Sequence, residues 1–120
     1  MKDKGVIYDK CKLFSRNIVV LCRFLNQNGE FVIAKQIIRS ATSIGANYSE
    51  SLGAESPSDF IHKLSISIKE TYETHYWLDI LKDSGYIDSD YYISLYRESE
   101  ELFKMITASI LTMKKRQGNT

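Results

Sequence analysis

Apolar side chains recur at steps of three and four residues through four stretches of the chain, and no stretch alternates with the period of a β-strand. Steps of three and four place side chains on one side of an α-helix. The pattern predicts an all-α protein with helices at about residues 5–27, 30–54, 57–83 and 88–116. Because the connections between such long helices are short, we expect residues 1–120 to form a single antiparallel up-down-up-down four-helix bundle.

Each expected helix has an apolar row that should face the core. The rows are Ile7, Cys11, Phe14, Ile18, Leu21 and Leu25; Phe31, Ala34, Ile38, Ala41, Gly45, Tyr48 and Leu52; Ile61, Leu64, Ile68, Thr71, His75 and Leu78; and Tyr92, Leu95, Ser99, Leu102, Ile106, Ser109 and Met113. The third helix carries a second row on a different face, made of Ile66, Glu73, Trp77 and Ile80. A helix that is apolar around much of its girth is expected to be central or to have two partners.

The expected helix ends carry recognisable capping residues. Gly29 can adopt the left-handed conformation that ends the first helix. Ser56 can cap the third helix, with Pro57 at the first helical position. The third helix should end near Gly85, and Asp88 can cap the fourth.

Composition narrows the class of protein. An apolar fraction of 43% and a charged fraction of 26% are typical of a folded globular chain. A formal net charge of +1 argues against a strongly electrostatic role. No run of about 18 apolar residues occurs, so we expect a cytoplasmic protein that does not span a membrane. Cys11 and Cys22 lie on the core side of the first helix, about 16 Å apart at 1.5 Å per residue, and are expected to be buried free thiols.

No recognisable catalytic, metal or cofactor motif is present. Di-iron bundles need a Glu-x-x-His pair on each of two helices, and the chain has none. It also lacks a glycine-framed serine and a phosphate loop. Glu70 and Glu73 lie one turn apart, but a carboxylate pair on one helix is weak evidence for acid–base chemistry. We therefore expect a protein that is not an enzyme and that holds neither metal nor cofactor.

A polar row of small and amide side chains runs along the second helix, at Gln36, Ser40, Ser43, Asn47 and Glu50. A solvated helix face usually carries Lys and Glu, whereas these groups permit close helix approach and neutral hydrogen bonds. The row favours a packed polar interface over an ordinary solvated face. Glu73 lies in line with apolar residues, so we expect a cationic partner for it, either Arg39 or Lys69.

Basic side chains form a second candidate surface. Lys12, Arg16 and Arg23 fall on one side of the first helix, away from its apolar row. Together with Lys35, Arg39 and the tail at 114–116 they offer a surface for phosphate groups of RNA or DNA. The alternative interpretation is that they only solubilise an outer face.

Three stretches resemble a known family. They are QIIRSATSIGANYSE at 36–50, SDFIHKL at 58–64 and KETYETHYWL at 69–78. In these stretches the sequence resembles the bacterial four-helix-bundle proteins encoded in intervening sequences of 23S ribosomal RNA genes. The resemblance implies that the signature positions, which we interpret as determinants of fold and assembly, are Arg39, Ser40, Ser43, Asn47, Glu50, Lys69, Glu70, Glu73 and Trp77.

Relatives in that family act as accessory proteins to the reverse transcriptases of diversity-generating retroelements, as barrel-shaped homopentamers that contact nucleic acid and the polymerase. The resemblance therefore implies a homo-oligomer, with a pentamer favoured, and a protein or nucleic-acid partner. The near-neutral charge differs from those basic accessory proteins and favours the intervening-sequence branch. Two hypotheses follow: a non-enzymatic assembly protein, and a nucleic-acid-binding accessory protein.

Overall fold

The computed structural model of the protein describes residues 3–118, which fold into four α-helices and no strand. The helices are α1 (Val6–Gln27), α2 (Phe31–Ser51), α3 (Pro57–Asp83) and α4 (Ser89–Gly118). The predicted all-α four-helix class is confirmed. The first and third helices match their expected bounds to within a residue.

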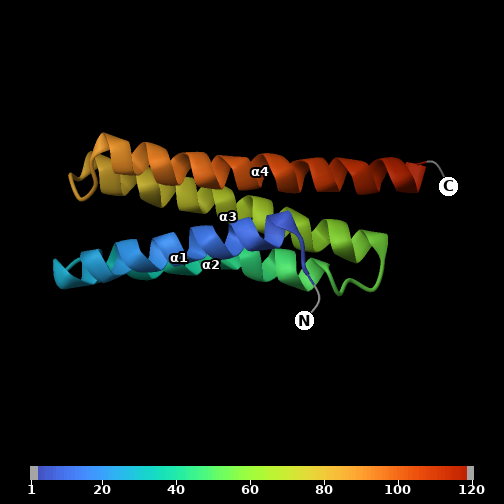
Figure 1. Ribbon diagram of the computed structural model, residues 1–120, viewed down its shortest axis with the longest axis horizontal. Coiled ribbons are helices and arrows are strands. Elements are labelled where there is room, and N and C mark those ends of the chain that lie inside the picture. The colour runs from blue at the N-terminus through green and yellow to red at the C-terminus, as the bar shows by residue number, and fades with distance from the viewer. Residues whose placement is uncertain (1–2, 119–120) are drawn as a thin grey trace.

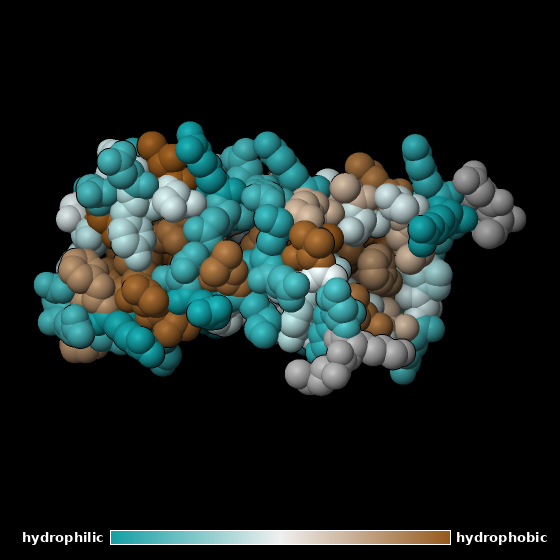
Figure 2. Space-filling view, viewed as in Figure 1, coloured by the Kyte–Doolittle hydropathy of each residue, from teal (hydrophilic) through white to brown (hydrophobic). Residues whose placement is uncertain are grey.

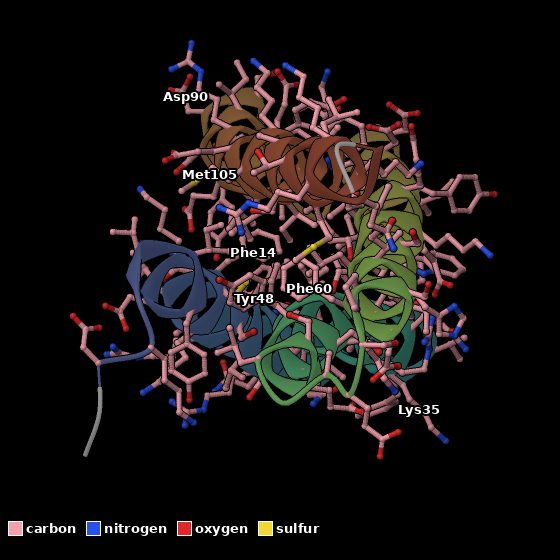
Figure 3. All side chains as sticks on the ribbon, turned by 90° about the vertical axis from the view of Figure 1, so that its right-hand side faces the viewer. Phe14, Lys35, Tyr48, Phe60, Asp90 and Met105 are labelled. Carbon is pink, nitrogen blue, oxygen red and sulfur yellow. The ribbon has the colours of Figure 1, made fainter. Side chains whose placement is uncertain are left out.

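The helices pack as a ring in which each contacts its neighbours in sequence and α4 returns to α1. Successive helices run in opposite directions, and α4 projects beyond the rest of the bundle at its C-terminal end (Figure 1). Seen along the bundle, Phe14, Tyr48 and Phe60 point between the helices, whereas Lys35 and Asp90 point outward (Figure 3). The contact between α2 and α3 is the most extensive, and that between α1 and α4 is the thinnest.

The α1–α2 and α3–α4 turns end the preceding helix in the same way. Gly29 and Gly85 have φ values of 79° and 81°, a conformation that glycine adopts without strain. At each turn the glycine N–H and the following N–H bond back to carbonyls of the last helical turn, in the pattern of a Schellman motif. At the helix starts, Ser56 accepts from the Asp59 N–H and Asp88 accepts from the Tyr91 N–H, as predicted.

The second helix ends earlier than expected, at Ser51 rather than at residue 54. The three residues that follow bond to carbonyls three residues back, from Leu52 to Ser49, Gly53 to Glu50 and Ala54 to Ser51. These shorter bonds tighten the chain into a 3₁₀-like turn, which ends the α-helical pattern.

The core confirms the central positions of the expected rows in α1 and α4. In α2 the expected row is partly wrong, because Phe31 and Leu52 are exposed whereas Ile37 and Ile44 are completely buried. Phe31 begins the helix and Leu52 follows its end, so neither lies between the other helices. The buried face of α2 is turned toward α3 and takes in polar Ser40.

In α3 the central row is buried at Leu64, Thr71 and Leu78, whereas His75 is only partly buried. The second apolar row of α3 is also only partly buried. Its members therefore lie on the flank of the bundle rather than in a second core, and they are Ile66, Glu73, Trp77 and Ile80.

On the opposite side of α2, glycine sets the distance to α1. A Cβ atom added at Gly45 would lie 3.0 Å from the Cβ of Cys11. The missing side chain therefore lets α1 and α2 approach closely, and α2 has a close neighbour on each side.

Candidate functional site

Hydroxyl groups line the contact between α2 and α3. The Ser67 hydroxyl donates to the carbonyl of Ile44 at 2.9 Å, and the Thr74 hydroxyl lies 2.9 Å from that of Ser40. Ser40, Ser67 and Thr74 are completely buried. Because these side chains are small and hydrogen-bonded, they allow the two helices to approach without leaving polar groups unpaired.

An ion-pair cluster covers the outer edge of this contact. Arg39 Nη1 lies 3.1 Å from Glu70 Oε2, and Arg39 Nη2 pairs with Glu73. Glu73 also accepts a hydrogen bond from Trp77 Nε1 at 3.1 Å. That bond and the Arg39 guanidinium lower the pKa of Glu73. The expected cationic partner of Glu73 is thus Arg39, whereas Lys69 is exposed.

The polar row of α2 faces α3 within the same chain. Besides the Ser40 contact, Glu50 pairs with Lys63 of α3 at 3.1 Å. Asn47 and Ser43 are half-buried and bond to carbonyls of their own helix, and Gln36 is half-buried as well. A packed polar interface therefore exists, but it joins two helices of one subunit and does not by itself indicate a second chain.

The structure brings four of the five candidate nucleic-acid-binding residues onto one face. Two hollows follow the groove between α1 and α2; Lys12 and Arg16 line the first, and Arg23 and Lys35 line the second. Arg39 is not part of this face, because its guanidinium is held by the glutamates of α3. The structure pairs Arg39 and Lys10 with carboxylates, but within residues 3–118 it shows no ion pair for the four groove cations.

Charge is segregated along the chain. Residues 10–49, which hold most of α1 and α2, carry six Lys and Arg side chains and a single carboxylate, Glu30. From Glu50 onward, acidic side chains outnumber basic ones. The net charge of +1 is a sum in which these two segments largely cancel, which is why composition alone conceals the basic face.

An apolar row lies on the outside of α1 and was missed by the sequence reasoning. Val6, Leu13, Val20 and Phe24 are 62%, 51%, 56% and 45% exposed, at steps of seven, seven and four residues. These steps place all four on one side of the helix. Val20 lines a hollow between α1 and α4 with Tyr91 of α4. Figure 2 shows brown apolar patches among hydrophilic side chains on the face that includes α1. The signal that could have identified the row is its own seven-residue step.

Two polar bridges span the thin contact beside this row. Asn17 Nδ2 donates to Glu98 at 2.8 Å, and Lys10 pairs with Glu101 at 2.7 Å. The row is therefore bordered on its α4 side by hydrogen-bonded polar groups, an arrangement that resembles the polar rim of a protein interface.

A serine and a histidine meet between α3 and α4, but not as a nucleophile and its base. His75 Nε2 lies 2.6 Å from the Ser99 hydroxyl, which donates its own proton to the carbonyl of Tyr96. The Ser99 hydroxyl is thus held between the imidazole and a backbone carbonyl. Ser99 is also completely buried, so the pair is structural.

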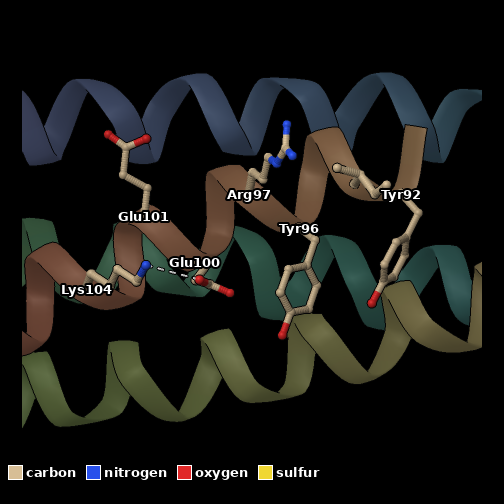
Figure 4. A pocket seen from close by; sticks show the side chains of 7 residues that line it. Tyr92, Tyr96, Arg97, Glu100, Glu101 and Lys104 are labelled. Carbon is tan, nitrogen blue, oxygen red and sulfur yellow. Dashed lines mark ion pairs between the residues drawn. The ribbon is translucent and has the colours of Figure 1, made fainter. Parts of the chain in front are cut away.

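The outer surface of α4 carries the hollow drawn in Figure 4, and its polar groups do not converge. Tyr92 and Tyr96 point toward α3, whereas Arg97 and Glu101 point the other way (Figure 4). The Tyr92 hydroxyl donates to Asp79 at 2.5 Å, which raises the pKa of Tyr92 to about 12. This surface presents no assembled set of reactive groups.

Reactive cysteines and metal ligands are likewise not assembled in the part of the chain that the structure describes. Burial raises the pKa of Cys11 to about 12 and that of Cys22 to about 11, so both thiols stay protonated near neutral pH. Across residues 3–118 no three His, Cys, Asp or Glu side chains are grouped as a metal site. None of the helices in that range is both long and apolar enough to cross a bilayer.

The fold and these surfaces define a small all-α four-helix protein with a basic groove between α1 and α2 and an exposed apolar row on α1. The model of the 23S rRNA-intervening sequence protein family matches residues 3–108. The chain belongs to this family. A crystal structure of a protein of unknown function from the S23 ribosomal protein family of Bacteroides thetaiotaomicron VPI-5482 is 46% identical. The match covers 88% of this chain and 98% of that one, with a TM-score of 0.85. No curated protein sequence matches the chain.

We predict that small side chains, rather than the ion pair, control the contact between α2 and α3. Ser67→Leu should lower the free energy of unfolding by about 1–3 kcal/mol, because extra volume in a close-packed contact forces the helices apart. Arg39→Ala should cost less than about 1 kcal/mol, because Arg39 is half-exposed and its ion pairs are screened. Urea denaturation measures both. Ser65→Leu is the control, since Ser65 lies outside the buried set; a larger loss for Arg39→Ala than for Ser67→Leu would contradict the prediction.

A second prediction concerns pH. Burial lowers the pKa of His75, and Asp79 and Glu100 only partly offset this effect. The unfolded chain therefore binds the proton more readily, so the free energy of unfolding should fall as the pH falls through the ordinary histidine pKa near 6.5. His75→Gln, which keeps a donor but does not titrate, should flatten this dependence. His62→Gln, at an exposed histidine of the same helix, is the control. Denaturant melts between about pH 5 and 8 provide the measurement; parallel profiles for parent and His75→Gln would show that His75 is not responsible.

Proposed function

We propose that this protein is a non-enzymatic, homo-oligomeric bundle that assembles through the outer face of α1 and engages a macromolecular partner in the cytoplasm. The apolar row Val6, Leu13, Val20 and Phe24 is the observation that supports this proposal most directly. Its first and last members are 18 residue steps apart, or about 27 Å at 1.5 Å per residue. Arg16 and Asn17 lie between Leu13 and Val20, so the row is a series of exposed apolar side chains on one face of the helix, which we interpret as anchor points for a second subunit.

Packing of the signature residues supports a structural rather than a catalytic role. Ser40 is buried between α2 and α3, and the cluster of Arg39, Glu70, Glu73 and Trp77 covers the edge of that contact. Side chains engaged with one another in this way are not available to a substrate. The family resemblance favours five subunits, and an apolar row repeated on each subunit suits a closed assembly.

The assembly proposal predicts that Leu13→Glu dissociates the oligomer, because it buries a charge in an apolar interface. Gel filtration coupled to light scattering should give five times the subunit mass of 13.8 kDa for the parent and a smaller species for the variant. Leu111→Glu is the matched control, since Leu111 is similarly exposed, at 57%, but lies on α4. A monomeric parent at micromolar concentration would contradict the proposal.

Nucleic-acid binding, as an accessory protein of the retroelement type, is a second candidate function, and the segregated charge favours it. Four groove cations without carboxylate partners form a positive face on α1 and α2. In an oligomer this face is repeated on every subunit, so weak sites can act together on one long polymer. A polyanion is the partner that such a face recognises.

The nucleic-acid function predicts a salt-dependent affinity. For duplex DNA the logarithm of affinity should fall with the logarithm of salt concentration by about 0.9 per phosphate neutralised. Arg16→Glu with Arg23→Glu should weaken binding and flatten this slope. Lys69→Glu with Arg97→Glu makes the same charge change on exposed positions of α3 and α4, and serves as control in a fluorescence titration. An equal loss for both double variants would mean that net charge, and not the α1–α2 face, governs binding.

A further inference from the structure

We propose that the groove between α1 and α2 binds a single strand of nucleic acid, with phosphates at two cation pairs and a base stacked on Phe31. This inference rests on the second candidate function above and names the form of nucleic acid and the residues that select it. The observations that support it are the two hollows, with the cations and aromatic residues that line them.

The first hollow combines two cations with hydroxyl groups. Lys12 and Arg16 lie one helical turn apart on α1, and Ser15 and Ser49 bring hydroxyls from the two helices. No carboxylate lines the hollow, and α2 contributes small residues at this point, among them Gly45. Cations together with hydroxyl donors, free of competing acids, form an environment suited to a phosphate group.

The second hollow repeats this chemistry farther along the groove. Arg23 of α1 and Lys35 of α2 line it together with the Asn26 amide. Arg16 and Arg23 are seven residues apart, or about 10 Å along the helix. At the 3.4 Å per nucleotide of each strand in duplex DNA, taken here as the reference spacing, this distance corresponds to about three nucleotides. One short strand lying in the groove therefore reaches both cation pairs.

Aromatic side chains distinguish this groove from a purely electrostatic surface. Phe31 lines the second hollow and is 63% exposed. Tyr8 lines the first hollow, but Lys4 and Lys12 lie 4.8 and 5.7 Å from its ring centroid, so the exposed ring of Phe31 is the one open to a base. Bases within a duplex are stacked on each other, whereas those of a single strand are free to stack on such rings. A basic groove bordered by aromatic rings thus favours the single strand.

The test is a fluorescence anisotropy titration of the full-length protein with an unstructured 12-nucleotide RNA and with a duplex of the same length. We expect tighter binding to the single strand, and a loss of about fivefold or more with Phe31→Ala, the lower bound for one stacked base. Tyr76→Ala, which removes an exposed aromatic ring from α3, should change nothing. Arg23→Gln with Lys35→Gln should reduce the salt slope by about 0.7, the value for the one single-strand phosphate that this cation pair holds.

Several outcomes would overturn the inference. One such outcome is equal affinity for duplex and single strand, together with an unchanged affinity of Phe31→Ala and a weaker affinity of Arg16→Glu with Arg23→Glu. The basic face would then bind nucleic acid, but not as a single strand held in the groove. Competition by uridine monophosphate at the same concentration as the strand would show a small-ligand site instead. No binding of any nucleic acid at low salt would overturn both, while the oligomer mass from light scattering decides the assembly function independently.

Discussion

The close contact between α2 and α3 is the constraint on which the remaining structure depends. Buried hydroxyls at Ser40, Ser67 and Thr74 let the two helices approach, and the absent side chain of Gly45 does the same between α2 and α1. Helix α2 is therefore fixed on both flanks, whereas the contact between α1 and α4 is thin and bridged by polar groups. Small residues at a helix contact set the distance between helix axes, and the larger side chains then fill the interior that remains.

This arrangement also determines which charges remain available at the surface. The glutamates of α3 that flank the contact hold Arg39, and Lys10 is held by Glu101 of α4. The remaining cations of the first two helices project into the outer groove, where no carboxylate lines either hollow. A chain of almost neutral net charge thus presents a positive face, because the distribution of charge and not its sum determines the local field.

Helix ends and the rows of α1 and α4 could be read from the sequence because they depend on local chemistry. Gly29, Gly85, Ser56 and Asp88 each act within one turn of the chain. The α2 row could not be read in the same way, since hydropathy favours Phe31 over Ser40 as a core residue. The position of α3 is needed to see that the small, hydrogen-bonded hydroxyl of Ser40 fits the contact. It is also needed to see that Phe31, at the start of α2, lies outside that contact.

The candidate surfaces could not be predicted from the period of the sequence, because they depend on how the helices are placed relative to one another. Both Arg39 and Lys69 were acceptable partners for Glu73, and the geometry of the α2–α3 pair selected Arg39. On α1, the apolar positions Leu13 and Val20 and the cationic positions Arg16 and Arg23 both repeat every seven residues. Arg16 lies three residues from Leu13 and four from Val20, so the two rows run side by side along the outer surface of α1. The apolar row borders α4, where Val20 and Tyr91 line one hollow, whereas the cations border α2. The proposed subunit interface therefore lies on the α4 side of α1 and the proposed nucleic-acid groove on its α2 side, with Arg16 at the border between them.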